Sequence, residues 1–152
     1  MHGRLILNED FPCRSVMHEA KSTGLCVGFD IVQIAQMTTS LTHFGDAFTH
    51  RLFTRDELNY ATQDVGLCAE RLAARFAAKE AVIKALQLSE VGVDWRQIEV
   101  IKLPLGRCCL QMHGLVAQLA SDYGVTQWLL SMSHDGDYAG AIVIALGFAR
   151  HR

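Results

Sequence analysis

Apolar residues follow two different periods along the chain after residue 24. The run Leu25–Phe29 is short and ends at Asp30, which predicts a buried strand. From residue 31 onward apolar positions recur at helical spacing, and Gly45 is expected to close that helix. Thr54 and Glu57 then have the spacing of a capping box, which indicates the start of another helix.

The strongest helical pattern covers residues 67–88. This segment is rich in alanine, contains neither glycine nor proline, and has apolar residues around much of its circumference. We therefore predict a largely buried helix. Four charged side chains are unusual in such a position and require an explanation: Arg75, Lys79, Glu80 and Lys84.

The chain after Gly92 has mostly strand character. Strands are predicted at residues 98–101, 108–112, 128–134 and 138–146, with one short helix at residues 113–123. This order is mixed rather than a regular βαβ repeat, so we expect an α+β fold with a largely antiparallel sheet. We predict one domain over residues 25–152, preceded by an extension at residues 1–24.

Composition limits the classes of function. The 152 residues are 50% hydrophobic and 20% charged, which is typical of one folded globular domain. A net charge of -2 gives no reason to expect a nucleic-acid partner, so an anionic ligand would need a local basic patch. No apolar run approaches the length of a membrane span, and no membrane association is expected.

Cysteine usage and the first residues favour a cytoplasmic protein. The five cysteines form no Cys-x-x-Cys pair and are interpreted as reduced thiols: Cys13, Cys26, Cys68, Cys108 and Cys109. Asn8, Glu9 and Asp10 stand where a signal peptide needs its apolar segment. Residues 1–24 are therefore interpreted as a polar extension or an artificial addition.

The charges of the buried helix allow two interpretations. Glu80 and Lys84 lie four residues apart on one face, and a surface ion pair of about 0.3–0.5 kcal/mol is the simpler one. Arg75 and Lys79 have the same spacing, but both are cations. They repel each other in a buried helix unless an anion lies beside them, and a phosphate ligand would supply it.

Asp30 and His134 are equally ambiguous on position alone. Asp30 is either the N-cap of the following helix or a magnesium ligand together with Glu80, since magnesium takes one or two carboxylates beside water and phosphate oxygens. His134 is either a satisfied polar residue or a phosphate contact at the end of a strand. The glycine-rich loops of common nucleotide-binding proteins are missing from the sequence.

Three segments in a fixed order resemble a known family. They are Gly-Phe-Asp-Ile-Val at residues 28–32, Arg-Phe-Ala-Ala-Lys-Glu-Ala at residues 75–81 followed by Lys84-Ala85, and Ser-Met-Ser-His at residues 131–134 followed by Tyr138-Ala139. A weaker match covers Arg51-Leu52-Phe53-Thr54 and Glu57. Together they resemble the holo-acyl-carrier-protein synthases, the small class of 4′-phosphopantetheinyl transferases.

The resemblance implies a fold and a set of site residues. The expected fold is compact and α+β, with a largely antiparallel sheet packed on a long central helix, in a homotrimer with active sites between subunits. Asp30 and Glu80 would bind Mg²⁺ on the coenzyme A diphosphate, and Lys84 would contact the reacting phosphate. The remaining coenzyme contacts implied by the resemblance are Arg51, Arg75, Lys79, Ser133 and His134.

The activity implied by the resemblance is transfer of 4′-phosphopantetheine from coenzyme A to a serine of an apo acyl carrier protein. Glu80 would accept the serine proton, directly or through a water molecule on the metal, and Lys84 would stabilise or protonate the leaving phosphate. Two alternatives remain open. One is a family member that serves a polyketide or other secondary-metabolism carrier, and the other is a catalytically silent module that binds a carrier or nucleotide.

Four departures from the family pattern bear on these alternatives. Residues 87–90, Gln-Leu-Ser-Glu, replace a glycine-containing loop, and residues 106–108, Gly-Arg-Cys, lack the usual proline. Gln33 stands in place of the common glutamate, and Asp135 follows His134 in place of threonine or serine. We expect these changes to affect coenzyme affinity and carrier choice more than the fold.

Overall fold

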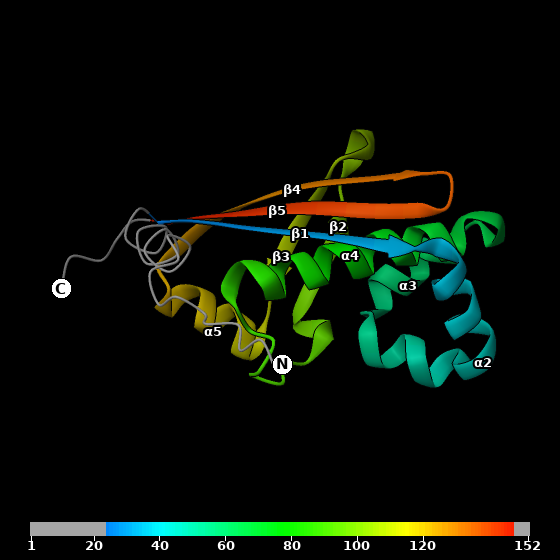
Figure 1. Cartoon of the computed structure of the whole chain (residues 1–152), viewed down its shortest axis with the longest axis horizontal. Helices are drawn as coiled ribbons and strands as arrows, with labels where there is room; N and C mark the ends of the chain where they lie inside the picture. The colour runs from blue at the N-terminus through cyan, green and yellow to red at the C-terminus, as the bar shows by residue number, and fades with distance from the viewer. Residues whose placement is uncertain (1–23, 148–152) are drawn as a thin grey trace, which may run out of the picture.

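The computed structural model describes residues 24–147, and its centre is a three-stranded antiparallel sheet. Strand β5 (Tyr138–Gly147) lies in the middle, between β1 (Leu25–Gln33) and β4 (Val125–Asp135). The long helix α4 (Cys68–Leu86) runs along one side of this sheet, as Figure 1 shows. The predicted α+β fold, with an antiparallel sheet on a long central helix, is therefore confirmed.

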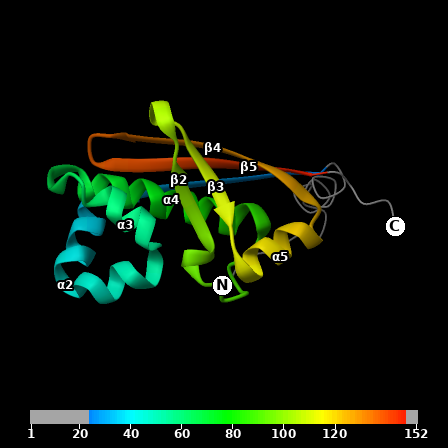
Figure 2. The ribbon, with the colours of Figure 1, turned by 180° about the vertical axis from the view of Figure 1, so that it is seen from behind.

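A second, two-stranded sheet crosses α4. It is the hairpin of β2 (Ile98–Lys102) and β3 (Cys108–Met112), which Figure 2 shows in front of the helix. Val100 of this hairpin shares a buried apolar cluster with Ala77 and Ala78 of α4. The remaining elements are α2 (Ile34–Leu52), α3 (Arg55–Ala61), α5 (Gly114–Asp122) and the short turns η1 (Val65–Leu67), η2 (Trp95–Gln97) and η3 (Pro104–Gly106).

Small residues let α4 approach the sheet closely. Ala77 and Ala81 are fully buried on α4, and Ala141 is 2% exposed on β5. At Gly28 of β1, an added Cβ would lie 1.8 Å from the backbone carbonyl oxygen of Ala81, which no side chain tolerates. Side chains alternate along a strand, so Asp30 points to the same helix as Gly28.

The boundary between the first strand and the first helix differs from the prediction. Strand β1 pairs with β5 as far as Gln33, and Asp30 lies inside it opposite Ala141. The interpretation of Asp30 as a helix N-cap is therefore wrong, because the cap position belongs to Gln33. Gly45 interrupts the helical geometry at φ 52° and ψ −135°, yet α2 resumes and ends at Leu52 rather than at the glycine.

Two further expectations concern the chain as a whole. None of the helices within residues 24–147 is long and apolar enough to cross a membrane. Four of the cysteines are free thiols in the same range, namely Cys26, Cys68, Cys108 and Cys109. Cys13 and nearly all of the expected extension lie outside the described residues.

We predict that Gly28→Ala destabilises the fold by about 1–3 kcal/mol, because the new methyl group forces α4 away from β1. Urea denaturation measures the loss. Gly140→Ala is the matched control on the neighbouring strand, since its added Cβ would meet no atom closer than 3.5 Å. Equal stability of the two variants would contradict the tight contact.

Candidate active site

Asp30, Glu80 and Lys84 come together at the edge of β1. The Lys84 ammonium group donates hydrogen bonds to Asp30 Oδ1 at 2.6 Å and to the carbonyl oxygen of Phe29 at 3.3 Å. Within residues 24–147, Lys84 pairs with this aspartate and not with Glu80, its neighbour one helical turn away. The structure thus joins two segments whose proximity the spacing in sequence could not show.

The electrostatics of the cluster are those of two crowded carboxylates beside one cation. Burial raises the pKa of Glu80, the nearby charge of Asp30 raises it further, and Lys84 acts in the opposite direction. The hydrogen bond to Asp30 raises the pKa of Lys84 above that of an ordinary lysine. Lys84 remains half exposed, so its ammonium group can also reach a ligand from solvent.

The donor set fits a magnesium ion that is shared with a phosphate ligand. Mg²⁺ takes one or two protein carboxylates and completes its shell with water and phosphate oxygens. Asp30 and Glu80 supply that number, and their mutual repulsion favours a cation between them. Within residues 24–147, no group of three or more His, Cys, Asp or Glu side chains could hold a metal ion. Water and ligand oxygens would therefore supply the remaining coordination positions of the magnesium ion.

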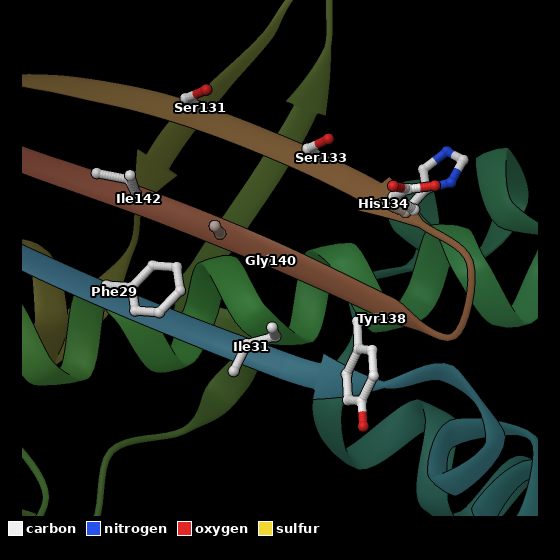
Figure 3. A pocket seen from close by; sticks show the side chains of 10 residues that line it. Phe29, Ile31, Ser131, Ser133, His134, Tyr138, Gly140 and Ile142 are labelled. Carbon is white, nitrogen blue, oxygen red and sulfur yellow. The ribbon is translucent and has the colours of Figure 1, made fainter.

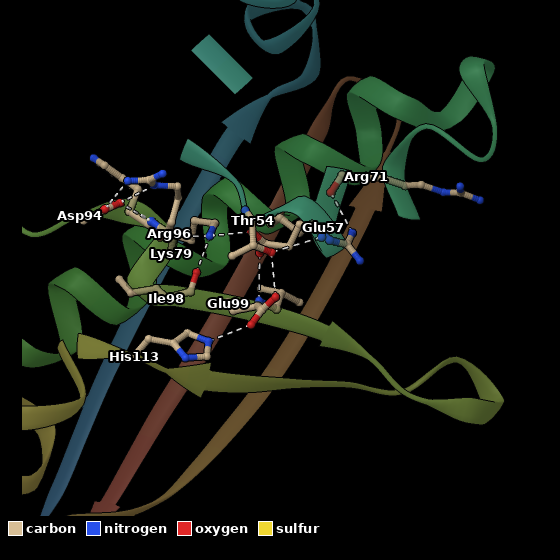
Figure 4. A network of polar contacts seen from close by, with 12 residues as sticks. Thr54, Glu57, Arg71, Lys79, Asp94, Arg96, Ile98, Glu99 and His113 are labelled. Atoms are coloured by element: carbon tan, nitrogen blue, oxygen red, sulfur yellow. Dashed lines mark hydrogen bonds and ion pairs between the residues drawn. The ribbon is translucent and has the colours of Figure 1, made fainter. Parts of the chain in front are cut away.

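Lys79 occupies a different environment, although it precedes Glu80 directly. Its side chain is fully buried and forms an ion pair of 2.8 Å with Glu57 of α3. It also donates to the backbone carbonyl oxygen of Trp95 at 3.1 Å and to that of Ile98, and Figure 4 shows the contacts with Glu57 and Ile98. Burial lowers the pKa of Lys79, and the Glu57 carboxylate opposes this effect. The anion required by this buried cation is therefore a carboxylate of the protein itself.

Glu57 connects α3 to the hairpin as well as to α4. The predicted capping box is present, because the Glu57 carboxylate accepts from the backbone N–H of Thr54 at 2.9 Å. The same carboxylate accepts from the N–H of Val100 in β2, also at 2.9 Å. Thr54 donates to Glu99, which in turn contacts His113 at 2.8 Å. The sequence predicted Glu57 as a capping residue but not as the buried partner of Lys79. The cation expected on a buried helix was the signal for this second role, because such a cation needs an anion beside it.

Arg75 lies near Lys79 on the side of α4 that faces α3. It is 3% exposed, and its guanidinium group stacks over the ring of Tyr60 at 4.4 Å from the centroid. One terminal nitrogen donates to the carbonyl oxygen of Arg71 at 3.1 Å. Its buried Nε has no hydrogen-bond partner in the part of the chain that the structure describes. Burial lowers the pKa of Arg75, which indicates incomplete compensation of its charge.

The other three residues expected at the site lie elsewhere on the surface. His134 is the last residue but one of β4, and its Nδ1 lies 3.5 Å from a carboxylate oxygen of Glu70. Ser133 lies on the opposite face of the sheet, in a shallow pocket of about 270 Å³ that also contains Phe29 and Tyr138 (Figure 3). Arg51 is exposed in the last turn of α2. One chain therefore brings Asp30, Glu80 and Lys84 together beside β1, whereas Ser133 and His134 line a separate pocket.

Comparisons with known proteins agree on one family. A family model described as the 4′-phosphopantetheinyl transferase superfamily matches residues 26–143. The holo-(acyl-carrier-protein) synthase of Koribacter versatilis is 42% identical over 121 residues, which are 79% of this chain and 96% of that protein. The synthase of Gloeobacter violaceus is 38% identical over 122 residues, which are 80% of this chain and 92% of that protein.

Solved structures show the same fold. An ACPS–CoA complex of Chronobacterium ammoniagenes has a TM-score of 0.72 and 34% identity, and the match covers 81% of this chain and 97% of that chain. The Helicobacter pylori holo-(acyl-carrier-protein) synthase, solved in complex with coenzyme A, has a TM-score of 0.69 and 26% identity. That match covers 78% of this chain and 98% of that chain.

We predict that Lys79→Met destabilises the fold by about 3–5 kcal/mol, because it leaves the Glu57 carboxylate buried without its partner. Denaturation in urea at one protein concentration measures the change. The double variant Lys79→Met with Glu57→Gln should recover part of the loss. Asp94→Asn, which breaks the exposed Asp94–Arg96 pair, is the control and should change stability little. A Lys79→Met protein of normal stability would refute the structural role.

Proposed function

Because the chain belongs to the 4′-phosphopantetheinyl transferase superfamily, we propose that it transfers 4′-phosphopantetheine from coenzyme A to a serine hydroxyl of an apo acyl carrier protein. The convergence of Asp30, Glu80 and Lys84 is the observation that carries the proposal. Relatives named holo-(acyl-carrier-protein) synthase and related structures with coenzyme A support the same donor and acceptor. We place the reaction in the cytoplasm, in fatty acid and lipid biosynthesis.

The proposed reaction is a substitution at the phosphorus atom that carries the pantetheine arm. The serine oxygen forms a new bond to this phosphorus, and the bond to the bridging oxygen of the diphosphate breaks. Adenosine 3′,5′-bisphosphate leaves with the bonding electron pair. We assign acceptance of the serine proton to Glu80, which lies beside Asp30 and Lys84.

Lys84, Asp30 and Glu80 together would stabilise the negative charge of the phosphate groups. The half-exposed ammonium group of Lys84 donates to an oxygen of the reacting phosphate and stabilises the leaving group. Asp30 and Glu80 would hold magnesium against the diphosphate. When bound, the ion neutralises charge on the phosphate oxygens, which is the main requirement of phosphoryl transfer.

A carrier from polyketide or other secondary metabolism is the second candidate acceptor, and the altered loop after α4 is the feature that motivates it. Gln87 adopts the left-handed conformation at φ 56°, which costs a non-glycine residue energy. Leu88 and Ser89 line a pocket of about 240 Å³ together with Glu80. The altered loop therefore borders the proposed site, where a carrier serine must arrive. Transfer to purified carriers of both kinds, measured side by side, distinguishes the two acceptors.

We also propose the homotrimer that the family resemblance implies. No helix of residues 24–147 covers the outer face of the three-stranded sheet, as Figure 1 shows. This outer face is apolar and exposed at Leu25, Val27, Phe29, Ile31, Leu129, Tyr138 and Ile142. An apolar surface of this kind is typical of an interface. Further copies would cover it and bring coenzyme contacts from a neighbouring chain to the carboxylates.

Glu80→Gln is expected to lower transfer at least about 100-fold, because it removes the proposed base and one negative charge from the metal site. Mass spectrometry of an apo carrier incubated with coenzyme A, Mg²⁺ and enzyme measures the added phosphopantetheine. Asp122→Asn, which neutralises an exposed carboxylate at the end of α5, is the control and should retain activity. Near-normal transfer by Glu80→Gln, with circular dichroism unchanged, would rule out the assigned role.

Phe29→Glu is expected to dissociate the oligomer, because it buries a charge in the proposed interface. Light scattering after size-exclusion chromatography measures the mass. Phe44→Glu replaces a phenylalanine of α2 that is even more exposed, at 65% against 54% for Phe29, and should leave the oligomer intact. A wild-type protein that is monomeric at micromolar concentration would refute the homotrimer.

A further inference from the structure

A cavity of about 700 Å³ lies between α2, α3 and the first two turns of α4. Figures 1 and 2 show α2 and α3 on the side of α4 that faces away from the three-stranded sheet. The volume of the cavity is typical of small-molecule sites, which measure about 300–1,000 Å³. None of Asp30, Glu80 and Lys84 lines it, so the cavity is separate from the proposed active site.

The cavity reaches into the hydrophobic core under α2 and α3. Phe53 and Leu72, which line it, are each only 1% exposed and belong to the apolar cluster between these helices and α4. Leu41 of α2 and Leu58 of α3 line it as well, and both pack against that cluster. Gly45, where the helical geometry of α2 is interrupted, also borders it. A lining of this kind favours a hydrocarbon body that displaces water from it.

The charged side chains around the cavity balance one another. Arg55 and Arg96 line it, and Asp46 is the single carboxylate among its lining residues. Arg96 forms an ion pair of 2.7 Å with Asp94, which leaves one arginine and one carboxylate. Within residues 24–147, neither Arg55 of α3 nor Asp46 of α2 forms an ion pair. With His50 neutral, a ligand with a net charge of either sign therefore finds no excess of opposite charge.

We propose that this cavity binds an uncharged molecule with a hydrocarbon body, such as a medium-chain alcohol. The apolar lining selects the body, and the balanced charge disfavours ionised forms, because enclosing an unpaired charge costs free energy. The amide group of Asn59, which also lines the cavity, can hydrogen bond a hydroxyl group of the ligand. The inference does not depend on the proposed transfer reaction.

The first test is displacement of a fluorescent apolar probe, N-phenyl-1-naphthylamine, from the full-length protein. We expect saturable binding of the probe, and competition by 1-octanol about fifteenfold stronger than by 1-hexanol, since each added methylene group contributes about a factor of four. Octanoate and octylammonium should compete at least about tenfold more weakly than 1-octanol. Absence of saturable probe binding, or equal competition by an ionised analogue, would overturn the inference.

Two variants that fill the cavity from different helices locate the probe. Leu41→Trp on α2 and Leu58→Trp on α3 should each weaken probe binding at least about tenfold, because the larger side chain occupies the space of the ligand. Leu115→Trp is the matched control, since Leu115 is an exposed leucine of α5 outside the cavity, and this variant should bind the probe as the wild type does. Unchanged binding by both cavity variants, with circular dichroism unaltered, would refute the site.

Nuclear magnetic resonance of the wild type gives a test that needs no substitution. Bound 1-octanol should show nuclear Overhauser contacts with the methyl groups of Leu41, Leu58 and Leu72, since these three side chains line the cavity. Contacts confined to the outer face of the three-stranded sheet, at Leu25 and Leu129, would assign the ligand to that face instead and contradict the cavity site.

Discussion

The contact between β1 and α4 at Gly28 determines where the chemistry lies. Only a hydrogen atom fits between the strand and the Ala81 carbonyl oxygen, so helix and sheet lie at the closest distance that a backbone allows. Buried alanines continue this seam along α4. At this separation a short aspartate on the strand reaches a long lysine on the helix, and Asp30 meets Lys84 at 2.6 Å.

Helix α4 serves two purposes on two sides. Consecutive residues in a helix point about 100° apart, so Lys79 and Glu80 cannot face the same neighbour. Lys79 turns toward α3 and stabilises the interior through Glu57, while Glu80 turns toward β1 and the proposed substrate. Within the Arg-Phe-Ala-Ala-Lys-Glu run, Lys79 therefore stabilises the fold and Glu80 belongs to the proposed active site. The match to the family motif alone does not separate these two roles.

The sequence predicted the elements well where a local pattern determines them. The alanine-rich helix expected at residues 67–88 is α4, and the strands expected at residues 98–101 and 108–112 are β2 and β3. The helix expected from residue 31 begins at Ile34, because pairing with β5 extends the strand over residues that also suit a helix. Tertiary contacts decided this boundary.

The site was less accessible to prediction from the sequence. Asp30 and Lys84 are 54 residues apart, and their contact depends on a glycine that has no side chain to suggest a role. The partner of Lys79 was equally hidden, since Glu57 already had a complete explanation as a capping residue. Each residue satisfied a local rule, and only the packing of α3 against α4 revealed the second role.

The Asp30–Lys84 pair also bears on how quickly the site can respond to a ligand. The helix and strand that carry these residues are locked together at Gly28, so neither backbone can move apart easily. The Lys84 side chain is half exposed and ends a flexible four-carbon stem. Its ammonium group can therefore exchange the aspartate for a phosphate oxygen by rotamer changes on the picosecond-to-nanosecond timescale. Occupation of the site then requires no slow rearrangement of α4 or of the sheet.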